Sequence, residues 1–378
     1  MENKRRLWLK QIGLGIAGIG LANVKSYAAP VASEDFFDPT ENHNDLILLR
    51  SNENPYGPSP LARKAIIDNA NKSNRYHWDV ANQLISDLAK TNNVNDENIL
   101  LGAGSTEILD MIAKLASLNN IHEPKATGAN YVIADPSYDY WTGTLDNLGV
   151  TRKAVPLTAD KKINLKAMLE AVNQDTKLVY ICNPNNPTGT ICEREALVEF
   201  VAKIPSNTML VIDEAYLDFT KQQSLSNIIK EHKKGIIVKT FSKMYGLAGA
   251  RIGYAIANKT LIDDLSNVQS NTNNSVSVVS KQAAIASLKD NQFVSNCYLL
   301  NENVRHYTIN ELQKLNCECI ASHTNFIYFS LEKYNKDFFK QLEINAIEGG
   351  RIYEEQGKWT RITVGTLDEM KKFIKALQ

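Results

Sequence analysis

One lysine of the chain stands among residue types that suit reaction with a phosphorylated aldehyde. Lys243 follows Thr240 and Ser242 and precedes Arg251 within residues 240–251. A lysine amine joins an aldehyde covalently once it has lost its proton, and a partly desolvated pocket favours that loss. The two hydroxyl groups and the guanidinium can hold a phosphate. The segment therefore predicts a site for pyridoxal phosphate, with an ordinary surface loop as the alternative.

Two apolar segments upstream each end in polar residues that suit the same cofactor. Residues 210–212 are typical of a buried strand, and they end at Asp213, whose carboxylate can pair with a pyridinium nitrogen and keep it protonated. Residues 178–182 predict a second strand, which runs into a loop rich in Asn, Pro and Gly at residues 183–189. An Asn amide in so rigid a loop can donate to the ring oxygen of the cofactor. A capping Asp and a plain Asn-Pro turn are the alternatives.

These three segments, in this order, resemble the fold-type I pyridoxal-phosphate aminotransferases of class I/II. Four further segments match in the order of the family: residues 52–58, 102–107, 135–138 and 360–366. The resemblance covers residues 46–378 and is greatest to the histidinol-phosphate aminotransferase branch. Seven motifs in one order are far more specific than any one of them. The resemblance implies an α/β protein with a mainly parallel, seven-stranded sheet in a large domain and a smaller α+β domain.

The resemblance also implies a role for each matching residue around the cofactor. Lys243, Asp213 and Tyr216 match the catalytic residues: the lysine that joins the cofactor, the partner of its ring nitrogen and a donor to its phenolic oxygen. The other cofactor-binding matches are Ser105, Thr106, Thr240, Ser242 and Arg251 at the phosphate, Asn186 at the phenolic oxygen and Tyr138 stacked on the ring. The family often has an acid at the position of Thr106, and a helix capping box at residues 104–107 is the alternative there. Tyr140 and Trp141 are alternatives to Tyr138.

The remaining implied roles concern the substrate and a second chain. Arg361 resembles the arginine that binds the α-carboxylate of the substrate through paired donors. Tyr56, Asn186 and Arg351 complete the implied substrate site. Arg351 lies nearer to Arg361 than the second arginine of the family does, so a surface arginine is the alternative. Tyr76 resembles a tyrosine that reaches the cofactor phosphate of a partner chain, which implies a homodimer with shared active sites.

The implied reaction transfers an amino group from an amino acid, or from an amine such as histidinol phosphate, to a 2-oxo acid. Lys243 would move a proton from Cα of the donor to the cofactor while Asp213 stabilises the electron-rich ring, and two half-reactions predict ping-pong kinetics. A decarboxylase of a phosphorylated amino acid on the same fold is the alternative. A noncatalytic binding protein is a second alternative, which predicts the loss of Lys243, Asp213 or Arg251, whereas all three are present.

The composition is that of a soluble enzyme. The chain has 378 residues, of which 43% are hydrophobic, so it can bury a large core, and its 42 basic and 42 acidic residues give a net charge of zero. No long basic run and no Cys and His cluster with zinc-ligand spacing occurs, so the sequence supports neither a nucleic-acid partner nor a metal site. The five cysteines lack the pattern of a disulfide framework and are expected to be mostly free thiols.

The first 29 residues have the layout of an export signal. Lys4, Arg5 and Arg6 precede an apolar, glycine-rich run at residues 12–24 and small residues that end at Ala29. The paired arginines resemble a twin-arginine signal, although Lys4 and Trp8 depart from its usual residues. We therefore expect export by the twin-arginine machinery to the periplasm after the cofactor has bound. An uncleaved membrane anchor is the alternative, and the protein is cytoplasmic if the signal is not used.

The rest of the chain is expected to form an arm and two domains: residues 30–60 as an N-terminal arm that joins the small domain, residues 61–290 as the large cofactor-binding domain and residues 291–378 as the small domain. Hydrophobic periodicity predicts helices at residues 61–70, 82–90, 106–117, 294–315 and 368–377. It predicts strands at residues 131–134, 177–182, 209–212, 236–239, 252–257, 325–331 and 361–364. This alternation indicates a mainly parallel sheet covered by helices.

Overall fold

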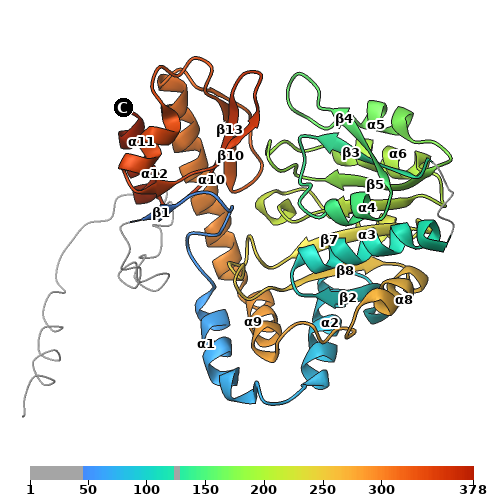
Figure 1. Cartoon of the computed structure of the whole chain (residues 1–378). Helices are drawn as coiled ribbons and strands as arrows, with labels where there is room; N and C mark the ends of the chain where they lie inside the picture. Colours follow the sequence, from blue (N-terminus) through green and yellow to red (C-terminus); the bar gives the residue numbers. More distant parts are fainter. Residues whose placement is uncertain (1–45, 123–127) are drawn as a thin grey trace, which may run out of the picture. The chain divides into compact units, whose positions relative to one another are not determined.

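The computed structural model describes residues 46–122 and 128–378, which belong to one compact unit. These residues form a seven-stranded sheet, a four-stranded sheet and a two-stranded pair, with helices packed against them (Figure 1). The predicted export signal at residues 1–29 lies outside the described residues, as do residues 30–45 of the predicted arm.

The seven-stranded sheet is mainly parallel, as predicted. Its strand order is β2 (Ile99–Gly102), β8 (Gly253–Ala257), β7 (Gly235–Thr240), β6 (Met209–Asp213), β5 (Thr176–Cys182), β3 (Asn130–Asp135) and β4 (Thr151–Pro156). The pairs from β7 to β4 are parallel, and β8 runs antiparallel to both of its neighbours. The parallel register brings the ends of β5, β6 and β7 to one edge, where the motifs around Asn186, Asp213 and Lys243 follow them.

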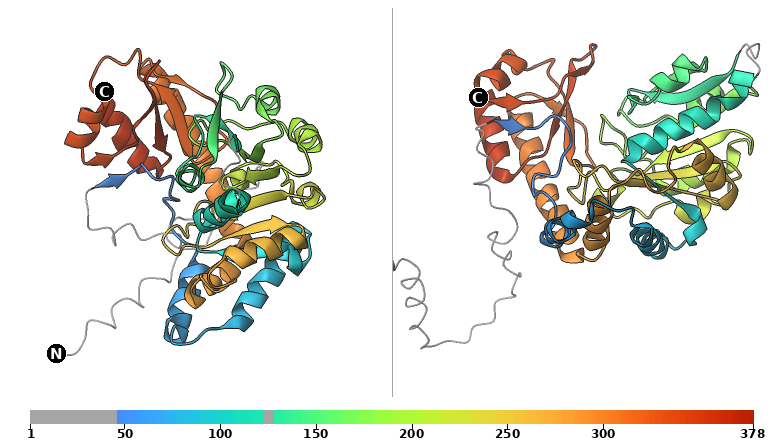
Figure 2. Two further views of the ribbon diagram at one scale, coloured as in Figure 1. Left: turned by 45° about the vertical axis from the view of Figure 1, so that its right-hand side comes forward. Right: turned by 60° about the horizontal axis from the view of Figure 1, so that its bottom comes forward.

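Helices cover both faces of this sheet, because its central strands are buried on both sides (Figure 2). One face packs against α1 (Pro60–Asn69), α2 (Trp78–Asn92), α5 (Leu165–Ala171), α6 (Arg194–Lys203), α7 (Ser226–Ile229) and α9 (Val278–Leu288). The other packs against α3 (Ser105–His122), α4 (Gly143–Asn147) and α8 (Lys259–Val268). Side-chain caps fix where several helices begin: Ser59, Asn258 and Ser277 each accept a bond from a first-turn amide.

The four-stranded sheet has the order β12 (Ile352–Glu354), β13 (Trp359–Thr363), β10 (Phe326–Ser330) and β9 (Glu318–Cys319). Its core is shared with α10 (Asn291–Lys314), α11 (Phe338–Ile344) and α12 (Leu367–Leu377). Strand β1 (Ile47–Leu48) pairs in parallel with β11 (Ile347–Glu348), and Ile47 and Leu49 enter the same core. The first described segment of the chain is therefore packed against C-terminal elements.

Each helix and strand predicted from periodicity is present, most of them with displaced ends. The sequence patterns missed β2, which has only four residues, and β4, a sheet-edge strand whose sequence Thr-Arg-Lys-Ala-Val-Pro has little apolar alternation. They also missed α9, which is buried on most sides and so lacks a polar stripe. The domain boundaries at residues 60 and 290 remain a prediction, since the described residues form one compact unit.

Candidate active site

A cavity of about 490 Å³ lies at the carboxyl ends of β5, β6 and β7, where open α/β sheets bind their ligands. Most of the predicted site residues line it: Ser105, Thr106, Tyr138, Asn186, Asp213, Tyr216, Thr240, Ser242, Lys243, Arg251 and Arg361. Residues that are far apart in the sequence therefore meet around one space, which is of a size that suits a small cofactor with its substrate.

Lys243 reaches this cavity from the turn that follows β7. Its Nζ donates a hydrogen bond to the backbone carbonyl of Ser51 at 2.9 Å and lies 5.7 Å from the centre of the Tyr216 ring. Burial, and next the positive charge of Arg361, lower the pKa of Lys243 to about 8. The amine therefore loses its proton far more readily than an exposed lysine, as reaction with an aldehyde requires.

Asp213 ends β6 with a buried carboxylate at the wall of the cavity. The Tyr180 hydroxyl donates to Oδ2 at 2.8 Å, and the backbone N–H of Ala215 donates to Oδ1 at 3.0 Å. Burial raises the pKa of Asp213 to about 6, although both hydrogen bonds favour the ionised form. The site thus contains an oriented carboxylate that is ionised at neutral pH and can pair with a protonated ring nitrogen.

A chain of side-chain hydrogen bonds joins Arg361 to Tyr216. Arg361 Nη1 donates to Asn186 Oδ1 at 2.5 Å, and Asn186 Nδ2 donates to the Tyr216 hydroxyl at 3.3 Å. Asn52 Nδ2 donates to the same hydroxyl at 3.0 Å. Burial raises the pKa of Tyr216, so its hydroxyl stays protonated at neutral pH. Because it already accepts two bonds, that hydroxyl can donate its proton to a ligand oxygen.

The predicted phosphate-binding residues gather where β2 turns into α3. Arg251 Nη1 donates to Ser242 Oγ at 3.5 Å, and Thr240 Oγ1 donates to the same Oγ at 2.9 Å. Gly104 has a φ of +80°, and a Cβ there would lie 2.3 Å from Arg251 Nη2. Because Gly104 has no Cβ, the Arg251 guanidinium can lie next to the start of α3. The first amides of that helix have no helical partners, so they favour an anion there.

Two of the three candidate aromatic residues line the cavity. Tyr138 and Tyr140 belong to its lining, and their ring centres lie 5.6 Å apart. Trp141 lies instead in the core, with its ring centre 5.0 Å from that of Tyr180. Burial raises the pKa of Tyr138. Tyr138 thus lies in the cavity lining, and its stacking on the cofactor ring remains a prediction, whereas Trp141 has an ordinary packing role.

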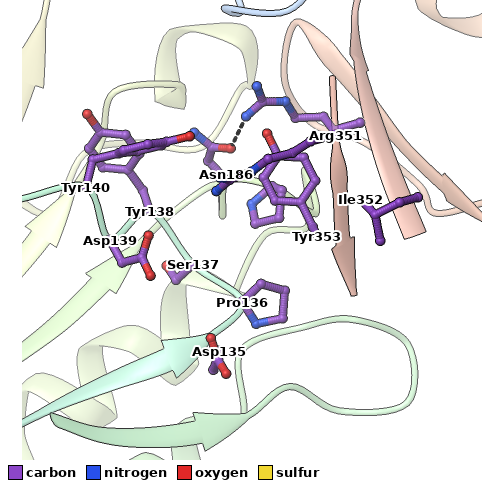
Figure 3. A pocket seen from close by; sticks show the side chains of 12 residues that line it. Asp135, Pro136, Ser137, Tyr138, Asp139, Tyr140, Asn186, Arg351, Ile352 and Tyr353 are labelled. Carbon is purple, nitrogen blue, oxygen red and sulfur yellow. Dashed lines mark hydrogen bonds between the residues drawn. The ribbon is translucent and has the colours of Figure 1, made fainter. Parts of the chain in front are cut away.

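A smaller cavity of about 230 Å³ adjoins the first and contains Arg351 in its lining. Figure 3 shows Tyr138 and Tyr140 on one side of this space and Tyr353 on the other, with Asn186 between them. The Arg351 guanidinium lies 5.5 Å from the ring centre of Tyr140 and 5.1 Å from that of Tyr353. Arg351 is therefore exposed beside the main cavity rather than within it.

Tyr56 and Tyr76 are not in the lining of either cavity. Tyr56 packs against the apolar cluster that contains Tyr216 and Phe326. Tyr76 is 75% exposed just before α2. The contacts of a single chain thus bring neither tyrosine to the site, and the roles implied for them remain predictions.

Several residues of the site were not predicted from the sequence. Tyr180 holds Asp213, the Ser51 carbonyl accepts from Lys243, and Asn52 holds Tyr216. Only Tyr180 had a signal that could have identified it: it lies two residues before the end of β5, the strand that pairs in parallel with β6. Glu107 accepts from the backbone N–H of Ala103 and from Ser275 Oγ. The alternative of a capping box at residues 104–107 does not describe this contact, because α3 begins at Ser105 and the residue before it, Gly104, has no side chain that could accept from a first-turn amide.

The residues present fit pyridoxal phosphate. An amine of lowered pKa, an ionised carboxylate and a hydroxyl donor line one cavity, as the aldehyde, ring nitrogen and phenolic oxygen require. The arginine beside the start of α3 provides cationic and amide donors for a phosphate. The donors thus form a set with the right chemistry for each part of the cofactor.

Comparison with known proteins gives the same result. Residues 44–377 match the family described as aminotransferase class I and II, and the chain belongs to that family. Histidinol-phosphate aminotransferase of Moorella thermoacetica is 34% identical over 340 residues, which cover 88% of this chain and 85% of the relative. Histidinol-phosphate aminotransferase 1 of Psychrobacter arcticus is 34% identical over 345 residues, 89% of this chain and 87% of the relative. The protein is thus a pyridoxal-phosphate-dependent aminotransferase similar to these enzymes.

Solved structures agree with this assignment. Histidinol-phosphate aminotransferase of Sinorhizobium meliloti, solved in complex with pyridoxal-5'-phosphate, has a TM-score of 0.78 at 25% identity, over 93% of this chain and 94% of that one. L-threonine-O-3-phosphate decarboxylase of Porphyromonas gingivalis has a TM-score of 0.72 at 23% identity, over 88% of this chain and 98% of that one, which is a likeness in fold alone. The decarboxylase alternative is therefore not favoured.

Three further properties of the described residues bear on the expectations from composition. All five cysteines are free thiols. In the described part of the chain, no helix is long and apolar enough to cross a membrane. Within residues 46–122 and 128–378, no group of three His, Cys, Asp or Glu side chains is arranged to hold a metal ion.

Proposed function

We propose that this aminotransferase takes the amino group of an amino acid, or of an amine similar to histidinol phosphate, and gives it to a 2-oxo acid in two half-reactions. The observation that carries the proposal is the single cavity that contains the Lys243 amine, the Asp213 carboxylate and the Arg361 guanidinium. The names of the similar enzymes support the choice of donor.

Each part of the cofactor would be held by its own residues. Lys243 would hold the aldehyde, Asp213 the ring nitrogen, and Tyr216 with Asn186 the phenolic oxygen. The phosphate would be held by Ser105, Thr106, Thr240, Ser242 and Arg251, and Tyr138 would cover the ring. When bound, the cofactor supplies an electron sink for the bond that breaks at Cα of the donor.

Arg361 would bind the carboxylate of the substrate. Arg361 as a whole residue is only 8% exposed, and its Nη2 donates to the backbone carbonyl of Arg50 at 2.7 Å. The ring centres of Phe326 and Tyr353 lie 5.3 and 5.2 Å from its Cζ. Because these rings and Asn186 fix the plane of the guanidinium, a carboxylate that binds to it is held in one orientation.

Lys243 would transfer the proton between Cα of the donor and the cofactor. The carbonyl of Ser51 and the ring of Tyr216 hold its amine at the cavity wall. A pKa of about 8 lies close enough to neutrality for the same nitrogen to accept and return a proton. Residues 50–53 also line the cavity beside the amine.

Arg351 and Tyr56 would complete the substrate site. Arg351 lines the adjoining cavity between Tyr140 and Tyr353 and makes no ion pair with any described residue. A guanidinium that has no ion pair among the described residues suits a second anionic group, such as a phosphate or a side-chain carboxylate. Tyr56, packed near Tyr216, would act from the edge of the site.

The proposal includes a homodimer and export. The exposed Tyr76 is available to reach the cofactor phosphate of a partner chain, which would make each site depend on two chains. Residues 1–29 would direct the folded, cofactor-loaded protein to the periplasm by the twin-arginine route. Pulse-labelling with and without Arg5→Lys and Arg6→Lys tests the route, since the paired change should keep the protein in the cytoplasm.

A panel of single half-reactions tests the reaction and ranks the donors. The cofactor-loaded enzyme is mixed with one donor at a time, including histidinol phosphate, L-glutamate and L-aspartate, without any acceptor. We expect one equivalent of oxo product per site, and reversal of the spectral change when a 2-oxo acid is added. Release of carbon dioxide with no oxo product from any donor would refute amino transfer.

A further inference from the structure

The turn between β4 and α5 brings Lys161 to the four-stranded sheet. Lys161 Nζ lies 2.8 Å from Glu354 Oε2 on β12 and 4.7 Å from the ring centre of Trp359 on β13. The side chains of Lys161 and Glu354 are only 15% and 26% exposed, so solvent screens this pair less than a surface pair. We use the name latch for Lys161, Glu354 and Trp359, which join the turn after β4 to the β12–β13 hairpin.

The backbone of Lys161 is in a conformation that disfavours lysine. Its φ is +60°, in the left-handed region where a residue with a Cβ costs about 1 kcal/mol relative to glycine. The turn itself is held by main-chain and hydroxyl contacts: Lys161 N–H donates to the Thr158 carbonyl at 2.9 Å, and Thr190 Oγ1 donates to the Lys161 carbonyl at 2.9 Å. Glycine would satisfy these contacts equally well, so only the side chain accounts for a lysine here.

The latch connects to Arg361 through packed rings. The Tyr328 hydroxyl donates to Glu354 Oε1 at 2.7 Å, and the Tyr328 ring stacks on Trp359 with centres 5.3 Å apart. The same ring meets that of Tyr353 edge-on at 6.3 Å. Tyr353 in turn lies 5.2 Å beneath the Arg361 guanidinium. Loss of the latch would therefore loosen the ring that holds Arg361.

We propose that Lys161 is a positioning residue, which acts through Glu354 and Tyr353 to hold Arg361 facing Asn186 across the cavity. The functional half of this inference rests on the proposed role of Arg361 in binding a carboxylate. The mechanical half, that the latch orders the β12–β13 hairpin, does not depend on that role.

Four variants separate these effects. Lys161→Gly removes the side chain and relieves the backbone, so the turn should fold. Glu354→Gln removes the charge from the other side and keeps an acceptor for Tyr328. Lys161→Arg preserves the cation and should keep the properties of the wild type. Lys162→Ala is the matched control, because Lys162 is in the same turn and forms its ion pair with the exposed Asp160, at 3.4 Å.

Hydrogen–deuterium exchange in the cofactor-loaded enzyme tests the mechanical half. Lys161→Gly and Glu354→Gln should each speed exchange of the amides at residues 352–354 by about tenfold, the size expected for loss of a partly buried ion pair with a cation–π contact. The double variant should exchange little faster than either single variant, because both substitutions break the same contact. Lys161→Arg and Lys162→Ala should match the wild type. Unchanged exchange in Lys161→Gly would overturn the latch.

Binding of 2-oxoglutarate, used as a carboxylate probe, tests the functional half. Lys161→Gly should raise its KM and its Kd by about tenfold while kcat changes by less than about threefold, because the variant perturbs Arg361 and not Lys243. Faster exchange without a change in KM or Kd would overturn the positioning role and leave a purely structural latch. A wild-type enzyme that binds no 2-oxoglutarate would overturn the role of Arg361 in binding a carboxylate. Hydrogen–deuterium exchange alone would then test whether the latch orders the β12–β13 hairpin.

Discussion

At the scale of residues, Lys243 and Asp213 show how burial prepares the site. Burial disfavours charge on both side chains, lowering the pKa of Lys243 to about 8 and raising that of Asp213 to about 6. Both groups therefore titrate close to neutral pH. Near-neutral pKa values suit groups that exchange or stabilise protons during a reaction.

The rate at which the cofactor-free protein captures pyridoxal phosphate should depend on the pH through Lys243. Only the uncharged amine attacks an aldehyde, so the rate should rise with pH and level off above about 8, the folded-state pKa. Stopped-flow mixing from pH 6 to pH 10 measures this profile. A midpoint near 10.5, the value of an ordinary lysine, would show that the amine is not desolvated.

Asp213→Asn should stabilise the cofactor-free protein and should abolish amino transfer by the cofactor-loaded enzyme. The pKa of this carboxyl rises on folding from 3.8 to about 6, so the folded chain binds more protons between these values. The stability it contributes is present below about pH 4 and is lost as the pH rises through about 6. At pH 8 we expect the variant to gain about 1–3 kcal/mol in free energy of unfolding, and less toward pH 5.

Urea unfolding measures this gain, with Asp263→Asn as the control. Asp263 is 59% exposed and pairs with Lys259 on the surface of α8, so its loss should change stability little. An Asp213→Asn protein that is less stable at pH 8 than the wild type would contradict the assigned cause of the pKa shift.

At the scale of elements, the turn from β2 into α3 depends on Gly104. Gly104→Ala would place a Cβ against Arg251 and strain a φ of +80°. We expect a loss of about 1–2 kcal/mol from strain alone, and cofactor affinity lowered by about tenfold or more as the guanidinium is displaced. Fluorescence titration of the cofactor-free protein measures the affinity.

Gly149→Ala is the matched control for that substitution. Gly149 has nearly the same φ, +79°, but nothing lies within 4 Å of its missing Cβ. It should lose similar stability and keep its cofactor affinity. Equal affinity losses in both variants would show that backbone strain, rather than contact with Arg251, is responsible.

The elements could be predicted from the sequence only where the pattern is strong. Buried apolar runs gave β5, β6 and β7, and with them the positions of Asn186, Asp213 and Lys243 at one sheet edge. The contacts between neighbouring strands could not be predicted from the sequence. Tyr180, for example, reaches Asp213 only because of the register of β5 against β6. The contacts of Lys161 were equally hidden, because they join segments 193 residues apart in sequence.

At the scale of the whole molecule, the proposed homodimer would explain why apolar residues near α1 and α2 are exposed in the single chain. Ile67, Tyr76 and Trp78 are 74%, 75% and 54% exposed. Apolar side chains this exposed in one region are typical of an interface. Ile67→Asp combined with Trp78→Asp should give monomers with weak cofactor binding, because Tyr76 of the partner would no longer reach the phosphate.

Analytical ultracentrifugation and a cofactor titration measure these two outcomes. Leu299→Asp, on α10, is the control, since Leu299 is also 54% exposed but lies on another element. A wild-type protein that is monomeric and fully active would contradict shared active sites. The sequence pattern could not predict the homodimer, because the two surfaces that would meet belong to identical chains and leave no separate signal in the sequence.

The most direct test of the whole account is the covalent bond at Lys243. The loaded enzyme is reduced with borohydride, digested and examined by mass spectrometry. We predict that the reduced cofactor is attached to Lys243 alone, and that Lys243→Ala carries none. Attachment at another lysine, or a loaded protein with no attachment at all, would contradict the account.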